Sequence, residues 1–243
     1  MPPAPLLQAC LNGNRPAGSH PALPVSPDEL AREARRSVAA GAGALHLHPR
    51  DHRGRETLDA AAVAAALNAV RAACPGVPVG LSSGFWILPD VAGQLAAARA
   101  WTVRPDFVSV NWHESHAVPL AGTLLELGIG VEAGIWTVEA ARAFLRWPRR
   151  DEALRVLVEL PDREDTLPDA ARILTLLDGT RVRPPRLLHG EGRSAWPLLH
   201  EAARLGLSTR TGLEDTLARP DGTPALDNAD LVRAARAVLA SPG

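Results

Sequence analysis

Short apolar segments and helical segments alternate along the 243 residues of this chain, and this alternation constrains its fold more than any other feature. Strands that alternate one by one with helices are typical of a parallel β-sheet. We count eight such units, and eight units in about 250 residues match the size of a closed barrel. We therefore predict an α/β protein, a single-domain (β/α)8 TIM barrel over residues 1–243. An open doubly wound sheet is the alternative, but eight near-equal units favour closure.

Apolar runs and helical periodicity set the expected bounds of each unit. The strands are expected at Leu6–Leu11, Ala44–His48, Val77–Ser82, Phe107–Asn111, Gly130–Ile135, Arg155–Leu160, Arg186–His189 and Thr209–Leu213. The helices are expected at Pro27–Ala40, Leu58–Ala73, Pro89–Trp101, Ala117–Leu127, Thr137–Leu145, Pro168–Leu177, Ser194–Leu205 and Asn228–Leu239. Ser26 precedes Pro27 and two acidic residues, which is typical of a helix N-terminus.

Composition excludes several function classes. The 26 basic and 27 acidic side chains nearly cancel, and no basic block stands out, so we expect no nucleic-acid partner. The basic residues are all arginine, and without lysine a Schiff-base mechanism is excluded. Two cysteines without paired spacing, no signal peptide and no apolar span indicate a cytoplasmic protein that does not enter a membrane.

Two histidines close the second expected strand, in the sequence Leu45-His46-Leu47-His48. Residues two apart on a strand point to the same face, so both imidazoles project together. Active sites of such barrels lie at the carboxyl ends of the strands. Converging imidazoles there predict a divalent metal site, with Zn2+ preferred and another divalent metal as the alternative. Ordinary hydrogen-bonded histidines are the competing interpretation.

Polar side chains gather at the other strand ends as well. They are Asn12, Ser82, Ser83, Ser109, Asn111, His113, Glu132, Glu159, His189, Glu191, Arg210, Glu214 and Asp215. Buried charges need partners or a metal, so this accumulation favours a functional site over a site-free barrel. Glu214 and Glu132 lead as a third metal ligand, with Glu159, Glu191 and His189 behind them. An ion pair with Arg210 is the competing interpretation for these carboxylates.

Three motifs together resemble the β-keto acid cleavage enzymes. They are Leu45-His46-Leu47-His48-Pro49-Arg50-Asp51, Ser82-Ser83-Gly84 and Arg210-Thr211-Gly212-Leu213-Glu214-Asp215. The resemblance runs over nearly the whole chain in motif order. It implies a zinc-dependent, oligomeric (β/α)8 barrel that condenses a β-keto acid with acetyl-CoA and releases acetoacetate and a new acyl-CoA.

The resemblance also implies individual roles. His46, His48 and Glu214 would be the metal ligands. Arg210 and Asp215 would form the pair that removes a proton from the keto acid, with Asp215 as the acceptor because arginine does not normally act as a base. Ser82 would hold the substrate carboxylate or receive developing charge, and Glu132 would support the site. Further substrate contacts are expected from Ser83, Asn12 and Asn111.

Two segments depart from the family pattern. Asn12-Gly13-Asn14-Arg15 lacks an expected glutamate, and Asn111-Trp112-His113-Glu114 stands where a smaller, glycine-containing turn is usual. Both changes touch the substrate pocket, and Trp86, Trp112 and Trp136 are expected either to narrow it or to pack under loops. A zinc-dependent hydrolase and a metal-retaining binding protein without turnover are the alternative functions. His-x-His on the second strand argues against the common hydrolase pattern, which places it on the first.

Overall fold

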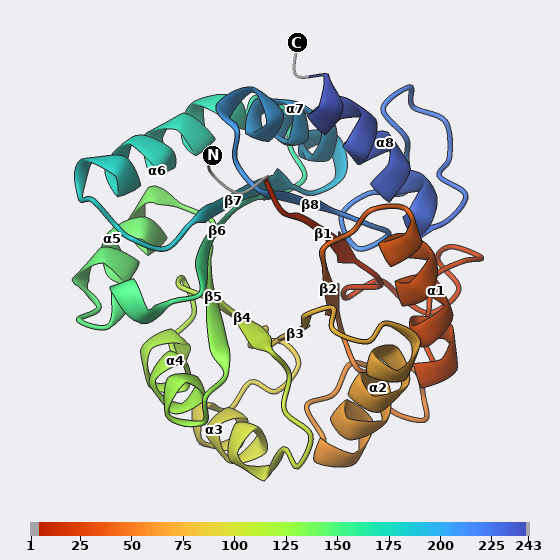
Figure 1. Cartoon of the computed structure of the whole chain (residues 1–243). Helices are drawn as coiled ribbons and strands as arrows, with labels where there is room; N and C mark the ends of the chain where they lie inside the picture. The colour runs from red at the N-terminus through yellow and green to blue at the C-terminus, as the bar shows by residue number, and fades with distance from the viewer. Residues whose placement is uncertain (1–4, 242–243) are drawn as a thin grey trace.

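A computed structural model of the chain, which describes residues 5–241, has eight parallel strands in a nearly closed ring with helices outside (Figure 1). The strands are β1 (Leu7–Cys10), β2 (Ala44–Leu47), β3 (Val79–Ser82), β4 (Phe107–Asn111), β5 (Gly130–Ile135), β6 (Arg155–Leu160), β7 (Arg186–Gly190) and β8 (Thr209–Thr211). Ladders join neighbours in the order β7-β6-β5-β4-β3-β2-β1-β8. A bridge between Leu187 and Ser208 joins β7 to the start of β8. The predicted (β/α)8 barrel is confirmed.

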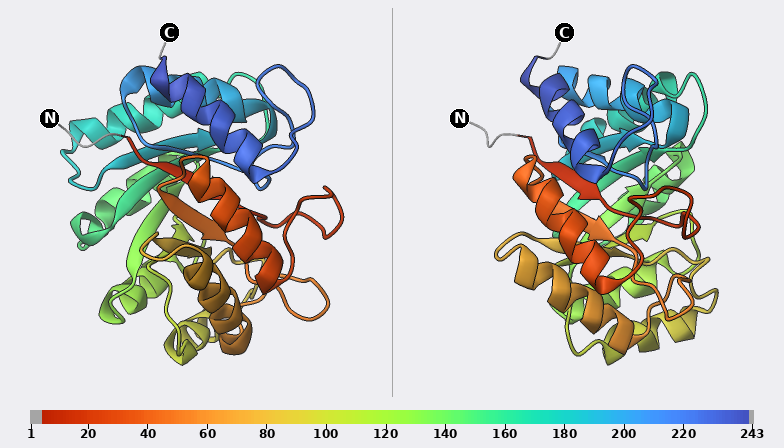
Figure 2. Two further views of the ribbon diagram at one scale, coloured as in Figure 1. Left: turned by 45° about the vertical axis from the view of Figure 1, so that its right-hand side comes forward. Right: turned by 90° about the vertical axis from the view of Figure 1, so that its right-hand side faces the viewer.

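Eight helices cover the outside of this ring, and Figure 2 shows them stacked along its flank. They are α1 (Pro27–Ala39), α2 (Ala60–Ala73), α3 (Val91–Ala100), α4 (Ala117–Glu126), α5 (Val138–Arg146), α6 (Leu167–Gly179), α7 (Ala195–Leu205) and α8 (Asn228–Ala240). Two short 3-10 turns, η1 (Arg150–Glu152) and η2 (Gly192–Ser194), lie between these elements. Among residues 5–241, no helix combines the length and apolar character that a membrane crossing requires.

The predicted start of α1 is confirmed in detail. The Ser26 hydroxyl accepts from the Glu29 backbone N–H, and the Glu29 carboxylate accepts from the Ser26 N–H. This reciprocal pair satisfies two backbone donors that the first helical turn leaves open.

Strand alternation divides each strand between the apolar core and the barrel mouth. In β4, Val108 and Val110 are fully buried in a cluster with helix residues such as Leu120, whereas Ser109 and Asn111 line a cavity. The two faces of β4 therefore differ, and the barrel mouth receives the polar set.

Four strands, β1, β2, β7 and β8, end one or two residues away from their predicted carboxyl ends, and the differences in β2 and β8 affect the site at this mouth. The expected second strand reaches His48 but β2 ends at Leu47, and the expected eighth strand reaches Leu213 but β8 ends at Thr211. After β8 the chain turns, because the backbone N–H groups of Asp215 and Thr216 both donate to the Gly212 carbonyl at 2.9 and 3.0 Å. The turn, and not strand alternation, therefore sets the position of Glu214.

Candidate metal centre

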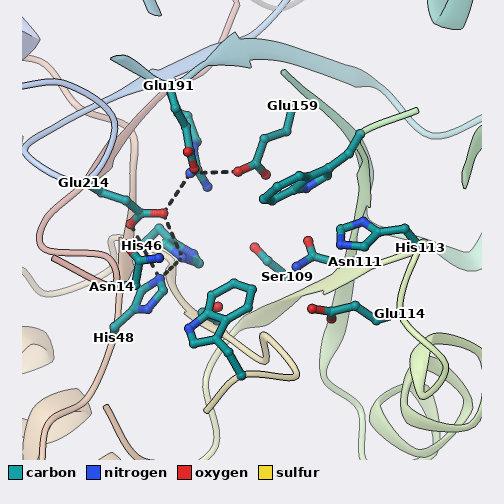
Figure 3. Close-up of a pocket in the computed structure, with 14 residues that line it drawn as sticks. Asn14, His46, His48, Ser109, Asn111, His113, Glu114, Glu159, Glu191 and Glu214 are labelled. Carbon is teal, nitrogen blue, oxygen red and sulfur yellow. Dashed lines mark hydrogen bonds and ion pairs between the residues drawn. The ribbon is translucent and has the colours of Figure 1, made fainter. Parts of the chain in front are cut away.

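Three side chains of the types that bind metal ions converge where β2 and β8 end (Figure 3). The Nε2 atoms of His46 and His48 lie 3.2 Å apart. Glu214 directs Oε1 toward His46 Nε2 and Oε2 toward His48 Nε2, each at 3.7 Å. One ligand atom from each residue lies within 4.8 Å of the other two, so these residues could hold a metal ion.

The donor set fits a divalent cation. Two imidazole nitrogens and one carboxylate form the His2Glu set of catalytic zinc sites, which leaves a further position for water or substrate. The Glu214 side chain is only 9% exposed, and its buried Oε2 atom has no hydrogen-bond partner among residues 5–241. A buried carboxylate oxygen without a partner is costly, and a cation between it and the imidazoles would remove that cost.

Neighbouring residues hold His48 in place. Asn12 clamps its backbone, because the Asn12 side chain accepts from the His48 N–H at 2.9 Å and donates to the His48 carbonyl at 2.9 Å. Glu56 lies 2.5 Å from His48 Nδ1 and also accepts from the Trp86 indole N–H at 3.1 Å. An acceptor on Nδ1 leaves Nε2 free as the metal-binding nitrogen. Sequence reasoning missed Glu56, because it lies in a loop after β2 that no periodicity places.

The pKa values of the two imidazoles shift in opposite directions. Burial lowers the pKa of His46 to about 3 against the opposing attraction of Glu214, so this ring stays neutral and able to bind a metal. Burial acts the same way on His48, but the Glu214 and Glu56 carboxylates outweigh it and raise the pKa of His48 to about 9. The pocket around His48 thus attracts positive charge, a proton or a metal.

Arg210 joins the candidate metal centre to Asp215. Its Nη2 donates to Glu214 Oε1 at 2.7 Å and to Asp215 Oδ1 at 2.9 Å. Asp215 is buried and lies behind the cavity wall, and its Oδ1 also lies 3.7 Å from His189 Nδ1. Burial outweighs the Arg210 guanidinium and raises the pKa of Asp215 to about 6. The structure brings the predicted pair together, with Arg210 between Asp215 and the cavity.

A cavity of about 270 Å³ opens at this end of the barrel. Its lining comprises Asn14, His46, His48, Ser82, Trp86, Ser109, Asn111, His113, Glu114, Trp136, Glu159, Glu191, Arg210 and Glu214. Of the predicted substrate contacts, Ser82 and Asn111 lie on this wall, whereas Asn12 and Ser83 do not. Ser83 instead donates its hydroxyl proton to the Ser109 carbonyl at 2.7 Å. The arrangement favours a positioning role for Asn12 and Ser83.

Glu132 also lies outside the cavity lining, fully buried in β5. It pairs with Arg155, its register partner on β6, and accepts from the Ser109 hydroxyl. The competing interpretation, an ion pair with Arg210, holds for Glu214 but not for Glu132, because the register of β5 against β6 places Arg155 opposite Glu132. Arg155 overcomes the effect of burial and lowers the pKa of Glu132 to about 2. Glu132 therefore holds Ser109 in the wall beside the cavity.

The tryptophans divide between pocket and core. Trp86 and Trp136 line the cavity, whereas Trp112 packs against Phe144 and Trp147 with ring centroids 5.0 and 5.2 Å away. Trp86 and Trp136 therefore narrow the pocket, whereas Trp112 has a packing role.

Fold and site together define a (β/α)8 barrel with a candidate His2Glu metal centre at its mouth. The chain belongs to the beta-keto acid cleavage enzyme family, whose profile matches residues 6–146 and 169–243. It is 35% identical over 80 residues to the 3-keto-5-aminohexanoate cleavage enzyme of Fusobacterium nucleatum subsp. nucleatum, and this match covers 32% of the chain and 29% of that relative.

Solved structures share the fold at low identity. The 3-dehydroquinate dehydratase of Geobacillus kaustophilus HTA426 superposes with a TM-score of 0.61 at 14% identity, over 97% of this chain and 90% of that one. A spore coat polysaccharide biosynthesis protein of Bacillus subtilis gives 0.64 at 12% identity, over 98% and 68%. These similarities support the barrel alone.

Proposed function

We propose that this protein is a zinc-dependent β-keto acid cleavage enzyme that uses acetyl-CoA as its second substrate. The observation that carries the proposal is the meeting of His46, His48 and Glu214 beside Arg210, in a chain of this family. The proposed products are acetoacetate and a new acyl-CoA. We also propose a homo-oligomer that works in the cytoplasm.

The proposed reaction balances without any further reactant. The keto acid loses the bond between C2 and C3, and its carboxymethyl fragment forms a new bond to the acetyl carbonyl carbon. The CoA thiolate released from acetyl-CoA takes the remaining acyl group. Proton removal at C2 begins the sequence, so the site needs a base and a group that stabilises an enolate.

The metal ligands would be His46, His48 and Glu214, and a bound divalent cation would supply Lewis acidity toward the ketone oxygen. Arg210 faces the cavity with its guanidinium and binds a carboxylate or stabilises enolate charge. Asp215 holds Arg210 through the 2.9 Å hydrogen bond and is the proposed final acceptor of the proton, transferred through the guanidinium. A raised pKa makes Asp215 a better base than an ordinary aspartate.

Ser82 and Asn111 lie on the wall, where they are proposed to orient the substrate carboxylate and the acyl chain. Asn12 and Glu56 are positioning residues, because they act on a substrate only through His48. Ser83 and Glu132 act the same way through Ser109, whose carbonyl and hydroxyl they bind.

A labelled co-substrate tests the proposal. The zinc-loaded protein would be incubated with a panel of β-keto acids and acetyl-CoA carrying ¹³C in both acetyl carbons. Mass spectrometry should find the label in acetoacetate and an unlabelled new acyl-CoA. His46→Ala, with circular dichroism showing an intact fold, should abolish both products.

Other results would favour the alternatives. A carboxylic acid and acetate formed from the keto acid without acetyl-CoA would identify a hydrolase. Metal binding without turnover of the panel or of ester, lactone and amide substrates would identify a binding protein. Unchanged turnover in His46→Ala would remove the metal from the mechanism.

A further inference from the structure

Trp86 links the metal cavity to a second hollow on the outside of the barrel. The residue is 46% exposed, it lines the cavity, and its indole N–H donates to Glu56 Oε2 at 3.1 Å. Trp86 also lines a hollow of about 440 Å³, which we call the side pocket. The side pocket is formed by Asp51, Arg55, Glu56, Thr57, Trp86 and Ile87. The chemistry proposed above gives this hollow no role.

A groove continues from the side pocket along the flank of the barrel. Thr57 and Ile87 line both spaces, so the two adjoin. The groove has a volume of about 410 Å³ and lies between the start of α2 and α3, which are neighbours around the ring (Figure 1). Its wall is largely apolar, with Leu58, Leu88 and Ala96 among its residues. Cavity, side pocket and groove therefore form one path from the metal centre to the outer surface.

Hydrogen bonds already fix the walls of this path. The buried indole N–H of Trp101, directly after α3, donates to the Leu58 carbonyl, shortly before α2, at 3.0 Å. The Gln94 side-chain amide donates to the Leu88 carbonyl at 3.2 Å and ties the loop after β3 to α3. A path with fixed walls binds a ligand without the entropic cost of ordering its loops.

The charged side chains of the side pocket already have partners. Arg55 donates to Asp51 Oδ2 through Nε at 2.9 Å and through Nη2 at 2.8 Å. Glu56 accepts from Trp86 and lies 2.5 Å from His48 Nδ1. An ion that entered would have to compete with these pairs, whereas an uncharged ligand with amide groups uses the donors and acceptors that remain. The side pocket therefore favours a neutral, amide-bearing chain.

Two other hollows of the described residues do not communicate with the metal cavity. One is lined by residues 21–24 and α1 and the other lies between α6 and α7, and neither shares a lining residue with the cavity. The second contains Arg186, the first residue of β7, so it lies toward the amino ends of the strands, opposite the mouth. Through Trp86, the side pocket has a connection to the metal centre that these two hollows lack.

We infer that this path holds the pantetheine arm of acetyl-CoA, with the thioester beside Arg210 and the nucleotide outside the barrel. This inference rests on the proposed function and adds the route of its second substrate. The arm is an uncharged chain in which methylene groups separate amides, and it ends in a branched dimethyl segment. Its amides suit the polar side pocket, and its methyl groups suit the apolar groove. Trp86 contacts the arm where the cavity meets the side pocket.

Substitutions that narrow the groove test the path with three acetyl thioesters. S-acetyl-N-acetylcysteamine carries only the thiol end of the arm, acetylpantetheine carries the whole arm, and acetyl-CoA adds the nucleotide. Ala96→Phe and Ala100→Phe, at exposed positions of α3, each place a ring in the groove. Each should raise the KM of acetylpantetheine and of acetyl-CoA at least about tenfold, because the ring takes the space of the arm.

Two comparisons show whether this effect is specific. The KM of the N-acetylcysteamine thioester and that of the keto acid should stay as in the wild type, because neither molecule reaches the groove. Ala171→Phe is the matched control, since Ala171 is an exposed alanine beside the hollow between α6 and α7. This variant should leave every KM unchanged.

A binding measurement separates the two proposals. S-ethyl-CoA is a thioether without an acyl carbonyl and cannot react, so calorimetry with the zinc-loaded protein reports its binding alone. At least about tenfold weaker binding in Ala96→Phe than in the wild type and Ala171→Phe supports the path even if no acyl-CoA forms, a result that would end the proposed function by itself.

Two outcomes would overturn the path. Formation of acyl-CoA with a wild-type KM for acetyl-CoA in both α3 variants would exclude the groove as the route and leave the proposed function standing. Groove variants that change the sedimentation of the protein, and not its affinity for S-ethyl-CoA, would show that a second copy of this chain covers the groove instead.

Discussion

Glu56 shows how one side chain outside the ligand set can control a metal centre. Its carboxylate lies 2.5 Å from His48 Nδ1 and fixes the ring so that Nε2 faces His46. We predict that Glu56→Ala weakens zinc binding by about 10–100-fold, the usual effect of losing such a partner. Competition with a chromophoric chelator measures the affinity.

Two control variants show whether the hydrogen bond matters. Glu56→Gln keeps an acceptor for the Nδ1–H and should lose less affinity than Glu56→Ala. Glu139→Ala removes an exposed carboxylate on α5 and should bind zinc like the wild type. Wild-type affinity in Glu56→Ala would show that the ring is oriented by Asn12 and packing instead.

Sequence patterns located some site residues and not others for a physical reason. His46 and His48 were predictable because a two-residue period places both rings on one face. Glu56 and the Glu132–Arg155 pair were not, because loop conformation and strand register bring them together. Local periodicity carries no information about either.

At the scale of elements, the junction between β8 and β1 depends on Gly212. A Cβ atom there would lie 1.9 Å from the Cys10 carbonyl oxygen and 2.6 Å from its carbon, both backbone atoms that cannot move away alone. We predict that Gly212→Ala destabilises the protein by about 2–5 kcal/mol and displaces Glu214. Urea unfolding measures the first effect and zinc affinity the second.

Gly122 provides the matched control for this glycine substitution. It lies inside α4, and a Cβ there meets no heavy atom within 4 Å. Gly122→Ala should therefore stabilise the protein by about 0.5–1 kcal/mol, because alanine favours the helix. Equal effects of the two substitutions would exclude the close approach of Gly212 to Cys10 as the cause.

The elements themselves were predictable because each strand and helix carries its own period and caps. The order of eight strands follows from that alternation, and Ser26 begins α1 as expected. The turn after β8 was not predictable, because Gly212 leaves the strand early for a contact with distant Cys10. Its consequence, the position of Glu214, therefore emerges only in the folded chain.

At the scale of the whole molecule, Glu191 makes stability depend on pH. Burial and Glu159 raise its pKa from 4.5 to about 7, so the folded protein binds a proton that the unfolded chain has already released between these pH values. Stability from this group is therefore full below about pH 4.5 and falls as pH rises to about 7. Glu191→Gln should gain about 1–3 kcal/mol relative to wild type between pH 4.5 and 8.

Urea unfolding of metal-free protein in chelator at both pH values measures this difference. Glu139→Gln is the exposed control, and its free energy of unfolding should differ from that of the wild type by the same amount at both pH values. A constant difference between Glu191→Gln and wild type would show that Glu191 ionises normally in the folded protein.

A metal at the barrel mouth would bind parts of the chain that are far apart in sequence. His46 and His48 stand at the end of β2 and Glu214 after β8, with β1 between them in the sheet, so a cation held by all three would bridge the second and last units of the barrel. A ligand that binds only the folded state adds about 4 kcal/mol to the free energy of unfolding at a free concentration 1,000 times its Kd.

We predict that chelator lowers the Tm of the zinc-loaded wild type and that zinc restores it. In His46→Ala/His48→Ala, Tm should not depend on zinc, because the remaining carboxylate alone cannot hold the ion. A zinc-dependent Tm in that variant would place the stabilising ion elsewhere, and the same Tm with and without zinc in the wild type would mean that the mouth of the barrel binds no metal.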